Sequence, residues 1–122
     1  MVGNHKLSLE ENFYLGVKKY YYYRLSYKMK NKLKIVLAQL NPIVGDVKGN
    51  VQKLINIRSN LNNNIDIIVV PELYISGYPI DDLVLRDDFL ELVGDQINKL
   101  AKLTNDGKAA IIIGAPRKEK DT

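Results

Sequence analysis

One glutamate, Glu72, directly follows the most apolar stretch of the chain. The stretch "DIIVV" (66–70) is followed by Pro71, which has no amide hydrogen and therefore ends a strand, and then by Glu72. Open α/β folds place their ligand sites at the carboxyl ends of parallel strands. A partly buried carboxylate there would have a raised pKa, as a general base needs. On chemistry alone, a lone glutamate at a strand end is more often a helix cap or a salt-bridge partner.

The segment after Glu72 contains turn residues and two tyrosines. Gly77 and Pro79 favour a tight turn. We expect that turn to bring Tyr74 and Tyr78 to the same mouth as the glutamate. The segment is therefore a candidate binding loop.

Two pairs of aspartates look like the paired carboxylates of a metal site, Asp81 with Asp82 and Asp87 with Asp88. Each pair precedes an apolar periodic run, which fits helix capping and first-turn charge. Divalent cations usually need further oxygen ligands at convergent spacing, so we interpret both pairs as helix-start residues and expect no metal. Arg86, between the pairs, would contact a neighbouring aspartate or a domain interface.

Composition excludes several classes of function. The chain has no cysteine, which rules out disulfides and thiolate metal sites within it, and its one histidine, His5, lies in a polar stretch and is interpreted as solvated. No run approaches the roughly 18 apolar residues of a membrane span, and residues 1–28 lack the continuous apolar stretch and the small-residue cleavage site of a signal peptide. We expect a cytoplasmic protein with no membrane partner.

Regular periodicity begins at residue 33. The pattern predicts strands over 33–40, 65–70 and 109–115, separated by amphipathic helices over 47–61 and 89–103. The order β-α-β-α-β implies parallel strands, right-handed crossovers and both helices on one face of the sheet. The apolar strands would then leave a bare hydrophobic face, so a second layer has to come from a partner chain or from a larger domain.

The first 32 residues form a separate segment. They hold seven lysines and arginines against two glutamates, whereas the remaining residues hold 11 basic and 12 acidic ones. Six of the eight tyrosines lie here without a clear period, and Met29 stands just before the first predicted strand. We expect an unstructured or mis-annotated extension. A nucleic-acid-binding arm is the alternative, disfavoured because no recognised binding fold surrounds it.

Three blocks carry a resemblance to a known family: "AQLNPIVGD" (38–46), "PEL" (71–73) and "GYPIDDLVLR" (77–86). Together they resemble the nitrilase, or carbon-nitrogen hydrolase, superfamily, in the branch of the glutaminase domain of glutamine-dependent NAD+ synthetases. The resemblance implies a four-layer α-β-β-α sandwich, of which this α/β chain would be the β-α-β-α-β portion of one half. Residues 33–122 would thus be a truncated carbon-nitrogen hydrolase domain.

The resemblance also implies a site built from a glutamate, a lysine and a cysteine. Glu72 matches the general base and Tyr78 matches a tyrosine near the glutamine pocket. A thiolate would attack the glutamine amide and release ammonia, with a lysine stabilising the oxyanion. In the family, ATP and Mg²⁺ are used by a separate synthetase domain, and we expect no cofactor within these residues.

The sequence departs from that pattern because it contains no cysteine. Lys118 and Lys120 belong to a hydrophilic tail and do not match the catalytic lysine. We therefore expect a fragment that does not hydrolyse glutamine alone. The alternatives are one piece of a split NAD+ synthetase, completed by a second chain, and a non-catalytic flavodoxin-like α/β binding module.

Overall fold

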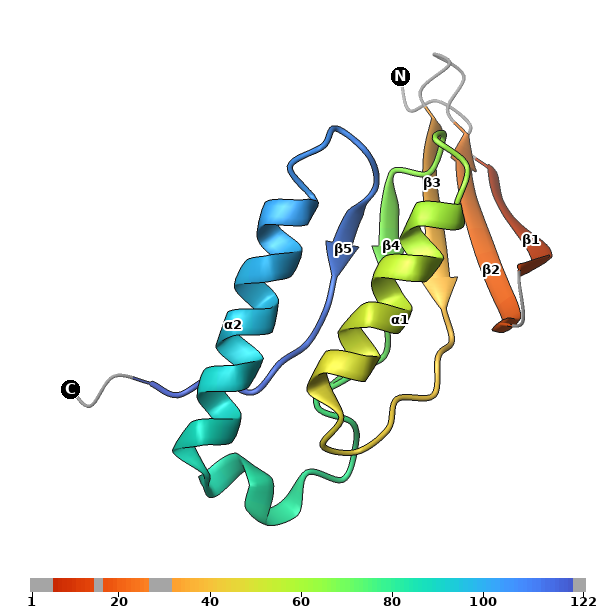
Figure 1. The fold of residues 1–122 in the computed structure, drawn as a ribbon. Helices are drawn as coiled ribbons and strands as arrows, with labels where there is room; N and C mark the ends of the chain where they lie inside the picture. The colour runs from red at the N-terminus through yellow and green to blue at the C-terminus, as the bar shows by residue number, and fades with distance from the viewer. Residues whose placement is uncertain (1–5, 15–16, 27–31, 120–122) are drawn as a thin grey trace.

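The computed structural model describes residues 6–14, 17–26 and 32–119, and these form one sheet with two long helices packed on it (Figure 1). The strand order is β1-β2-β3-β4-β5. The elements in chain order are β1 (Lys6–Tyr14), β2 (Val17–Ser26), β3 (Lys32–Ala38), α1 (Val47–Asn60), β4 (Ile67–Val69), the 3₁₀ helix η1 (Asp81–Leu85), α2 (Asp87–Leu103) and β5 (Ala110–Ile112). None of the described helices is both long and apolar enough to cross a membrane.

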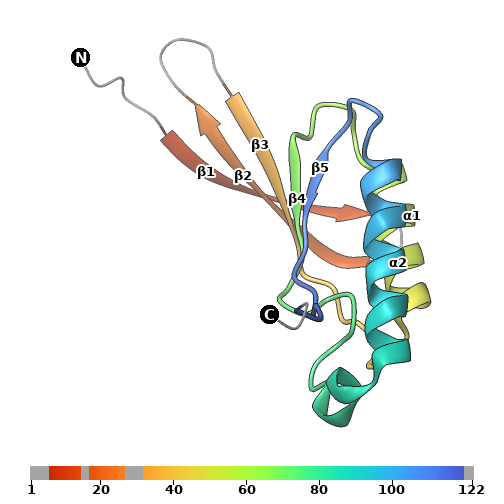
Figure 2. The ribbon, with the colours of Figure 1, turned by 90° about the vertical axis from the view of Figure 1, so that its left-hand side faces the viewer.

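The β-α-β-α-β order predicted from residue 33 is confirmed. β3 pairs with β4 and β4 with β5, both in parallel, and Figure 2 shows both helices on the same side of these strands. β4 and β5 are shorter than predicted, but the backbone ladder continues beyond their ends. The amide of Asp66 donates to the carbonyl of Lys34 at 2.9 Å, and that of Val70 to Ile112 at 3.2 Å.

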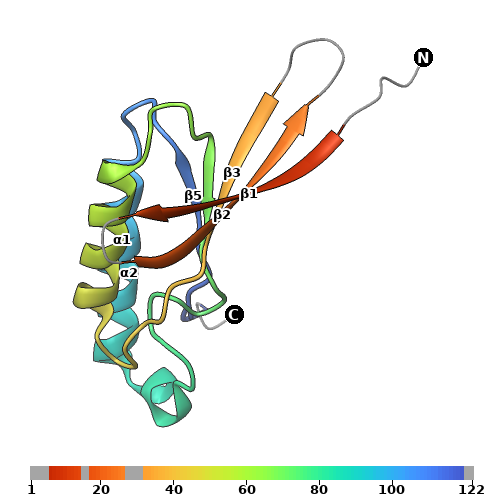
Figure 3. The same ribbon diagram turned by 90° about the vertical axis from the view of Figure 1, so that its right-hand side faces the viewer.

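The two faces of the parallel strands differ in burial, because successive side chains of a strand point to opposite faces. Val36 of β3 and Ile68 of β4 are fully buried beneath the helices. The opposite face carries apolar side chains in register across the sheet, and these are half-buried or exposed: Ile35 and Ile67, then Leu37, Val69 and Ile112. Figure 3 shows no helix on this face. The bare apolar face that the sequence predicts is therefore present among the described residues.

The N-terminal segment differs from the expectation of an unstructured extension. Its described residues form the hairpin of β1 and β2, and β2 pairs antiparallel with β3. Two physical reasons account for the difference: tyrosine, phenylalanine and valine favour strands, and β3 would have a free edge on the side away from β4 if the hairpin did not pair with it. His5 and Met29 lie outside the described residues.

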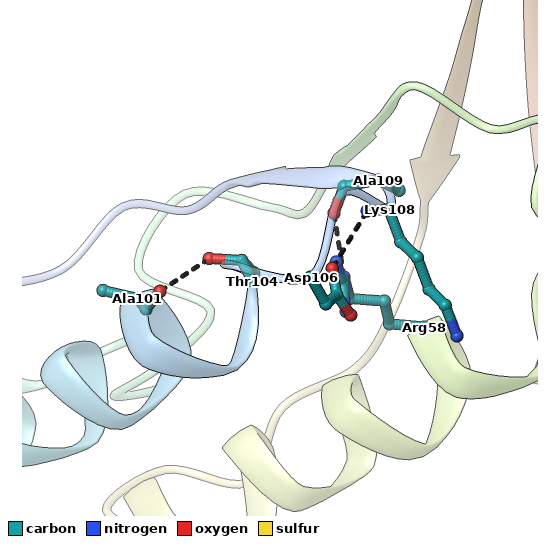
Figure 4. Close-up of polar contacts among 6 residues, drawn as sticks. All are labelled: Arg58, Ala101, Thr104, Asp106, Lys108 and Ala109. Carbon is teal, nitrogen blue, oxygen red and sulfur yellow. Dashed lines mark hydrogen bonds and ion pairs between the residues drawn. The ribbon is translucent and has the colours of Figure 1, made fainter.

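Arg58 ties the end of α1 to the loop before β5 (Figure 4). Its Nε donates to the carbonyl of Ala109 at 2.8 Å, and its two terminal nitrogens donate to the carboxylate of Asp106 at 2.8 and 2.7 Å. These hydrogen bonds hold the pKa of Asp106 well below its ordinary value and raise that of Arg58. The contact fixes the amino end of β5, opposite the end of the sheet where Glu72 lies.

Candidate functional site

Glu72 lies on a compact turn at the carboxyl end of β4. Leu73 has a positive φ of 53°, and its carbonyl accepts hydrogen bonds from the amides of Ser76 and Gly77, at 3.2 and 2.8 Å. The side chain of Glu72 is exposed, so the expectation of a partly buried carboxylate is wrong for this chain. The bare sheet face explains the difference, because no second layer covers this edge of the sheet in the described residues.

Asn50 joins this turn to the loop that follows β3. It is 3% exposed in the first turns of α1. Its Oδ1 accepts from the amide of Ile43 at 2.9 Å, while its Nδ2 donates to the carbonyls of Ile43 and Ile75, at 2.8 and 3.2 Å. The amide of Gly45 also donates to the carbonyl of Ser76 at 2.9 Å. The two loops at the carboxyl ends of β3 and β4 are thus held as one unit.

Two glycines allow close backbone contacts around this unit. Gly77 has a φ of 76°, and a Cβ there would lie 2.6 Å from the Cα of Val44. A Cβ on Gly114, just after β5, would lie 3.2 Å from the amide nitrogen of Leu73. The backbone at Glu72 is therefore bordered by both the β3 loop and the segment after β5.

The two tyrosines of the turn have different roles. Tyr74 is fully buried and its hydroxyl donates to the carbonyl of Asn50 at 2.9 Å. Burial raises the pKa of Tyr74 to about 12. The expectation that Tyr74 lies at the mouth is therefore wrong. Tyr78 is 76% exposed on the same connection as Glu72.

The aspartate pairs lie at helix starts, as the sequence predicts, but neither supplies the residue before the helix. Asp81 and Asp82 begin η1, and Asp87 and Asp88 begin α2. Arg86 bonds Asp88 at 2.6 Å in an exposed ion pair, which holds the pKa of Asp88 below its ordinary value. Within the described ranges, no group of three or more histidine, cysteine or acidic side chains is arranged to hold a metal ion.

Lys118 of the tail is paired with an aspartate at the start of α2 rather than with Glu72. Lys118 forms an exposed ion pair with Asp87 at 2.9 Å, at the start of α2. Lys120 lies outside the described residues. A groove of about 550 Å³ runs beside Lys118 between α2 and residues 113–118, and a smaller hollow of about 380 Å³ lies beside η1. Glu72 lines neither of these two hollows.

Asn50 was missed by reasoning from the sequence. Asparagine in the first turns of a helix is common and usually solvated, so its residue type gives no warning of burial. The available signal was its position, because the helical period places residue 50 beside the apolar Val47, Val51 and Leu54. A polar residue on a core-facing stripe indicates a buried hydrogen-bonding role.

Known proteins resemble this chain in sequence over most of its length. The sequence model of the family described as carbon-nitrogen hydrolase matches residues 34–122. The glutamine-dependent NAD(+) synthetase of Thermotoga maritima is 36% identical over 91 residues, which cover 74% of this chain and 16% of that protein. Those of Aquifex aeolicus and Rhodobacter capsulatus are 36% and 35% identical over 89 residues, covering 73% and 72% of this chain.

The chain spans about 16% of the length of each of these three relatives. The family match covers most of the chain and includes Glu72, Tyr78 and the loop that Asn50 holds. It begins within β3 and leaves the N-terminal hairpin outside. The chain therefore belongs to the carbon-nitrogen hydrolase family.

Proposed function

We propose that residues 34–122 are the front portion of a glutamine amide hydrolase domain that supplies ammonia for NAD+ synthesis. In this proposal Glu72 is the general base and Tyr78 borders the glutamine pocket. The relatives' name, glutamine-dependent NAD(+) synthetase, supports the substrate. The observation that carries the proposal is the turn itself: Glu72 is exposed at the carboxyl end of a parallel strand, on a backbone held by Asn50 and bordered by Gly114.

The chemistry requires groups that these 122 residues do not contain. Glu72 would take the proton of a thiol, the thiolate would attack the side-chain amide carbon of glutamine, and Glu72 would return the proton to the nitrogen so that ammonia leaves and a thioester remains. Water would then release glutamate from the thioester. Because the sequence has no cysteine, the nucleophile has to come from other residues, in a longer polypeptide or in a second chain. In this proposal the oxyanion-stabilising lysine comes from those residues too.

The bare sheet face is where we propose that this second layer packs. Its apolar rows, with Leu37, Val69 and Ile112 in register, need a cover of similar character. A cover there would also reach the open side of Glu72. In this proposal ATP and Mg²⁺ belong to a synthetase domain beyond residues 34–122. The 122 residues alone are then expected to release no ammonia from glutamine.

A chimera tests the proposal. Residues 34–122 replace the matching stretch of the Thermotoga maritima relative, which supplies the remaining groups, and release of ammonia from glutamine is measured. We expect the chimera to be active and Glu72→Gln to lower kcat by at least about 100-fold, since a general base contributes about that much. Glu91→Gln, an exposed carboxylate on α2, is the matched control and keeps full activity.

Three results would contradict the proposal. A Glu72→Gln chimera as active as its parent would remove Glu72 from the role of base. Release of ammonia by the purified 122-residue chain would show that the nucleophile is not a thiol from elsewhere. Binding of glutamine by the chimera with no hydrolysis, in a form that is folded by circular dichroism, would also count against it.

A further inference from the structure

The β1–β2 hairpin covers a long edge of the core sheet. β2 pairs with β3 at seven consecutive positions, from Tyr20 opposite Ala38 to Ser26 opposite Lys32. β3 pairs with β4 at only three positions. The longer of the two contacts made by β3 is therefore with residues that lie outside the family match.

If the edge of β3 were unpaired, it would be prone to pair with a strand of another chain. The stretch "LKIVLA" (33–38) is apolar except for Lys34, contains no proline, and is rich in residues that favour strands. Val36 and Ala38 within it are core residues, so the edge cannot turn away from the sheet without disrupting the core. Unpaired edges of this kind pair readily with the same strand of another copy.

The edge that replaces it is of a different kind. β1 is the outermost strand, and its sequence carries Lys6, Glu10 and Glu11. Its pairing with β2 also has an irregularity between Asn12 and Tyr14, as in a β-bulge. Charged residues and bulges are the devices by which natural edge strands avoid further pairing. With the hairpin in place, the outer edge of the sheet is β1, which has charged residues and an irregularity, and no longer the apolar and regular β3.

We propose that the β1–β2 hairpin is an intramolecular edge cap, which occupies the β3 edge and excludes β3 of a second copy from pairing there. The cap gives the N-terminal segment a function that does not depend on the proposed glutaminase role. In this proposal the β3 edge is a surface that binds an extended strand, and in this chain that strand is β2.

Engineered cysteine pairs test the pairing in the full chain, which has no cysteine of its own. Tyr21→Cys with Leu37→Cys, and Leu25→Cys with Leu33→Cys, place each pair directly opposite in the β2–β3 register. Directly opposite Cα atoms in antiparallel strands lie within the range that a disulfide spans. Tyr21→Cys with Leu33→Cys is the control, four positions out of register and therefore roughly 13 Å apart along the strands.

The expected result is intramolecular oxidation of both matched pairs, at least about 10-fold faster than the control pair, because only the matched pairs meet the geometric limits of a disulfide. Mass spectrometry of the monomer detects the bond. Equal rates for matched and control pairs would overturn the proposal. So would matched pairs that stay reduced, as in an arm that is free to bind nucleic acid.

A second variant tests exclusion of another copy. Tyr21→Pro with Tyr22→Pro removes two successive β2 amides, one of which faces β3 because amides alternate along a strand. The parent and the variant both carry Ile112→Lys to discourage association through the bare sheet face. Hydrogen exchange and sedimentation at increasing concentration are the readouts.

In the proline variant we expect the amides of residues 33–37 to exchange at least about 10-fold faster in dilute solution, and the chain to associate at higher concentration, while the amides of α1 keep their protection. Retained protection of α1 shows that the domain has not simply unfolded. Unchanged exchange of residues 33–37 would overturn the edge cap, and so would a variant that stays monomeric at every concentration.

Discussion

Asn50 and Arg58 are both buried on α1, and each binds segments far apart in the sequence. Asn50 holds the β3 loop to the Glu72 turn, and Arg58 holds the loop before β5. A buried polar group that loses its partner costs free energy, so these two side chains determine the positions of loops at opposite ends of the sheet.

Asn50→Ala is expected to destabilise the chain by about 2 to 3 kcal/mol, because the amide and carbonyl of Ile43 and the carbonyl of Ile75 lose their buried partner. The free energy of unfolding is measured by urea titration followed by circular dichroism. Gln52→Ala on the exposed side of the same helix is the control and should change stability little. Equal effects of the two substitutions would contradict the role of Asn50.

Asp106 predicts a pH dependence of stability. Its pKa is held well below the ordinary value, first by hydrogen bonds from Arg58 and then by the amide of Lys108. Below about pH 4 the unfolded chain therefore binds more protons than the folded one, and the free energy of unfolding falls as the pH falls further. Asp106→Asn should remove the contribution of Asp106 to the pH dependence of the free energy of unfolding. Glu91→Gln, at an exposed position on α2, is the control. Urea titrations at several pH values measure the slope.

For individual residues, the sequence predicts the place of Glu72 but not its surroundings. Pro71 after an apolar run is a local signal, and the strand does end there. The exposure of Glu72 depends on what covers the sheet, which no local pattern encodes. Tyr74 was expected at the mouth because turn residues surround it, yet its ring is buried and its hydroxyl reaches Asn50, a contact across 24 positions.

Among the elements, those with a strong period were predicted and those without one were missed. α1 and α2 follow the apolar spacing of their sequences closely. η1 was missed because five residues are too few to show a period, and it appears only as a connection. β1 and β2 were missed because their pairing partner is β3, and the sequence of the hairpin alone does not reveal a free edge elsewhere.

Alanine substitutions of Gly77 and Gly94 are predicted to change stability in opposite directions. Gly77→Ala is expected to cost more than about 2 kcal/mol, because its φ is positive and a Cβ would meet the backbone of Val44. Gly94 lies inside α2, where a Cβ would meet nothing within 4 Å, so Gly94→Ala should stabilise the chain by about 1 kcal/mol. Thermal unfolding of both variants checks the opposite signs. A neutral Gly77→Ala would show that the two loops are not in fixed contact.

For the whole molecule, the bare sheet face predicts association. Ile112 is 55% exposed and in register with Val69 and Leu37, so it continues an apolar row across three strands. Ile112→Lys should weaken self-association by about 10-fold, or about 1.4 kcal/mol, because a charge would have to be buried between faces. Sedimentation at increasing concentration measures it.

Leu85→Lys is the control for that experiment, since Leu85 is 79% exposed on η1, away from the sheet face. It should leave association unchanged. A parent chain that is monomeric at every concentration and unfolds in one cooperative thermal transition would contradict the prediction. That result would show that the apolar sheet face does not need a cover for the chain to be stable.

The shared side chain of Asn50 also restricts how the region around Glu72 can move. The carbonyls of Ile43 in the β3 loop and of Ile75 in the Glu72 turn accept hydrogen bonds from the same side-chain amide of Asn50. Gly77 packs against Val44 where the two loops meet. One loop cannot open as a hinge while the other stays in place without breaking buried hydrogen bonds. The backbone that carries Glu72 is therefore expected to keep its position relative to the β3 loop when a ligand or another polypeptide meets the exposed glutamate.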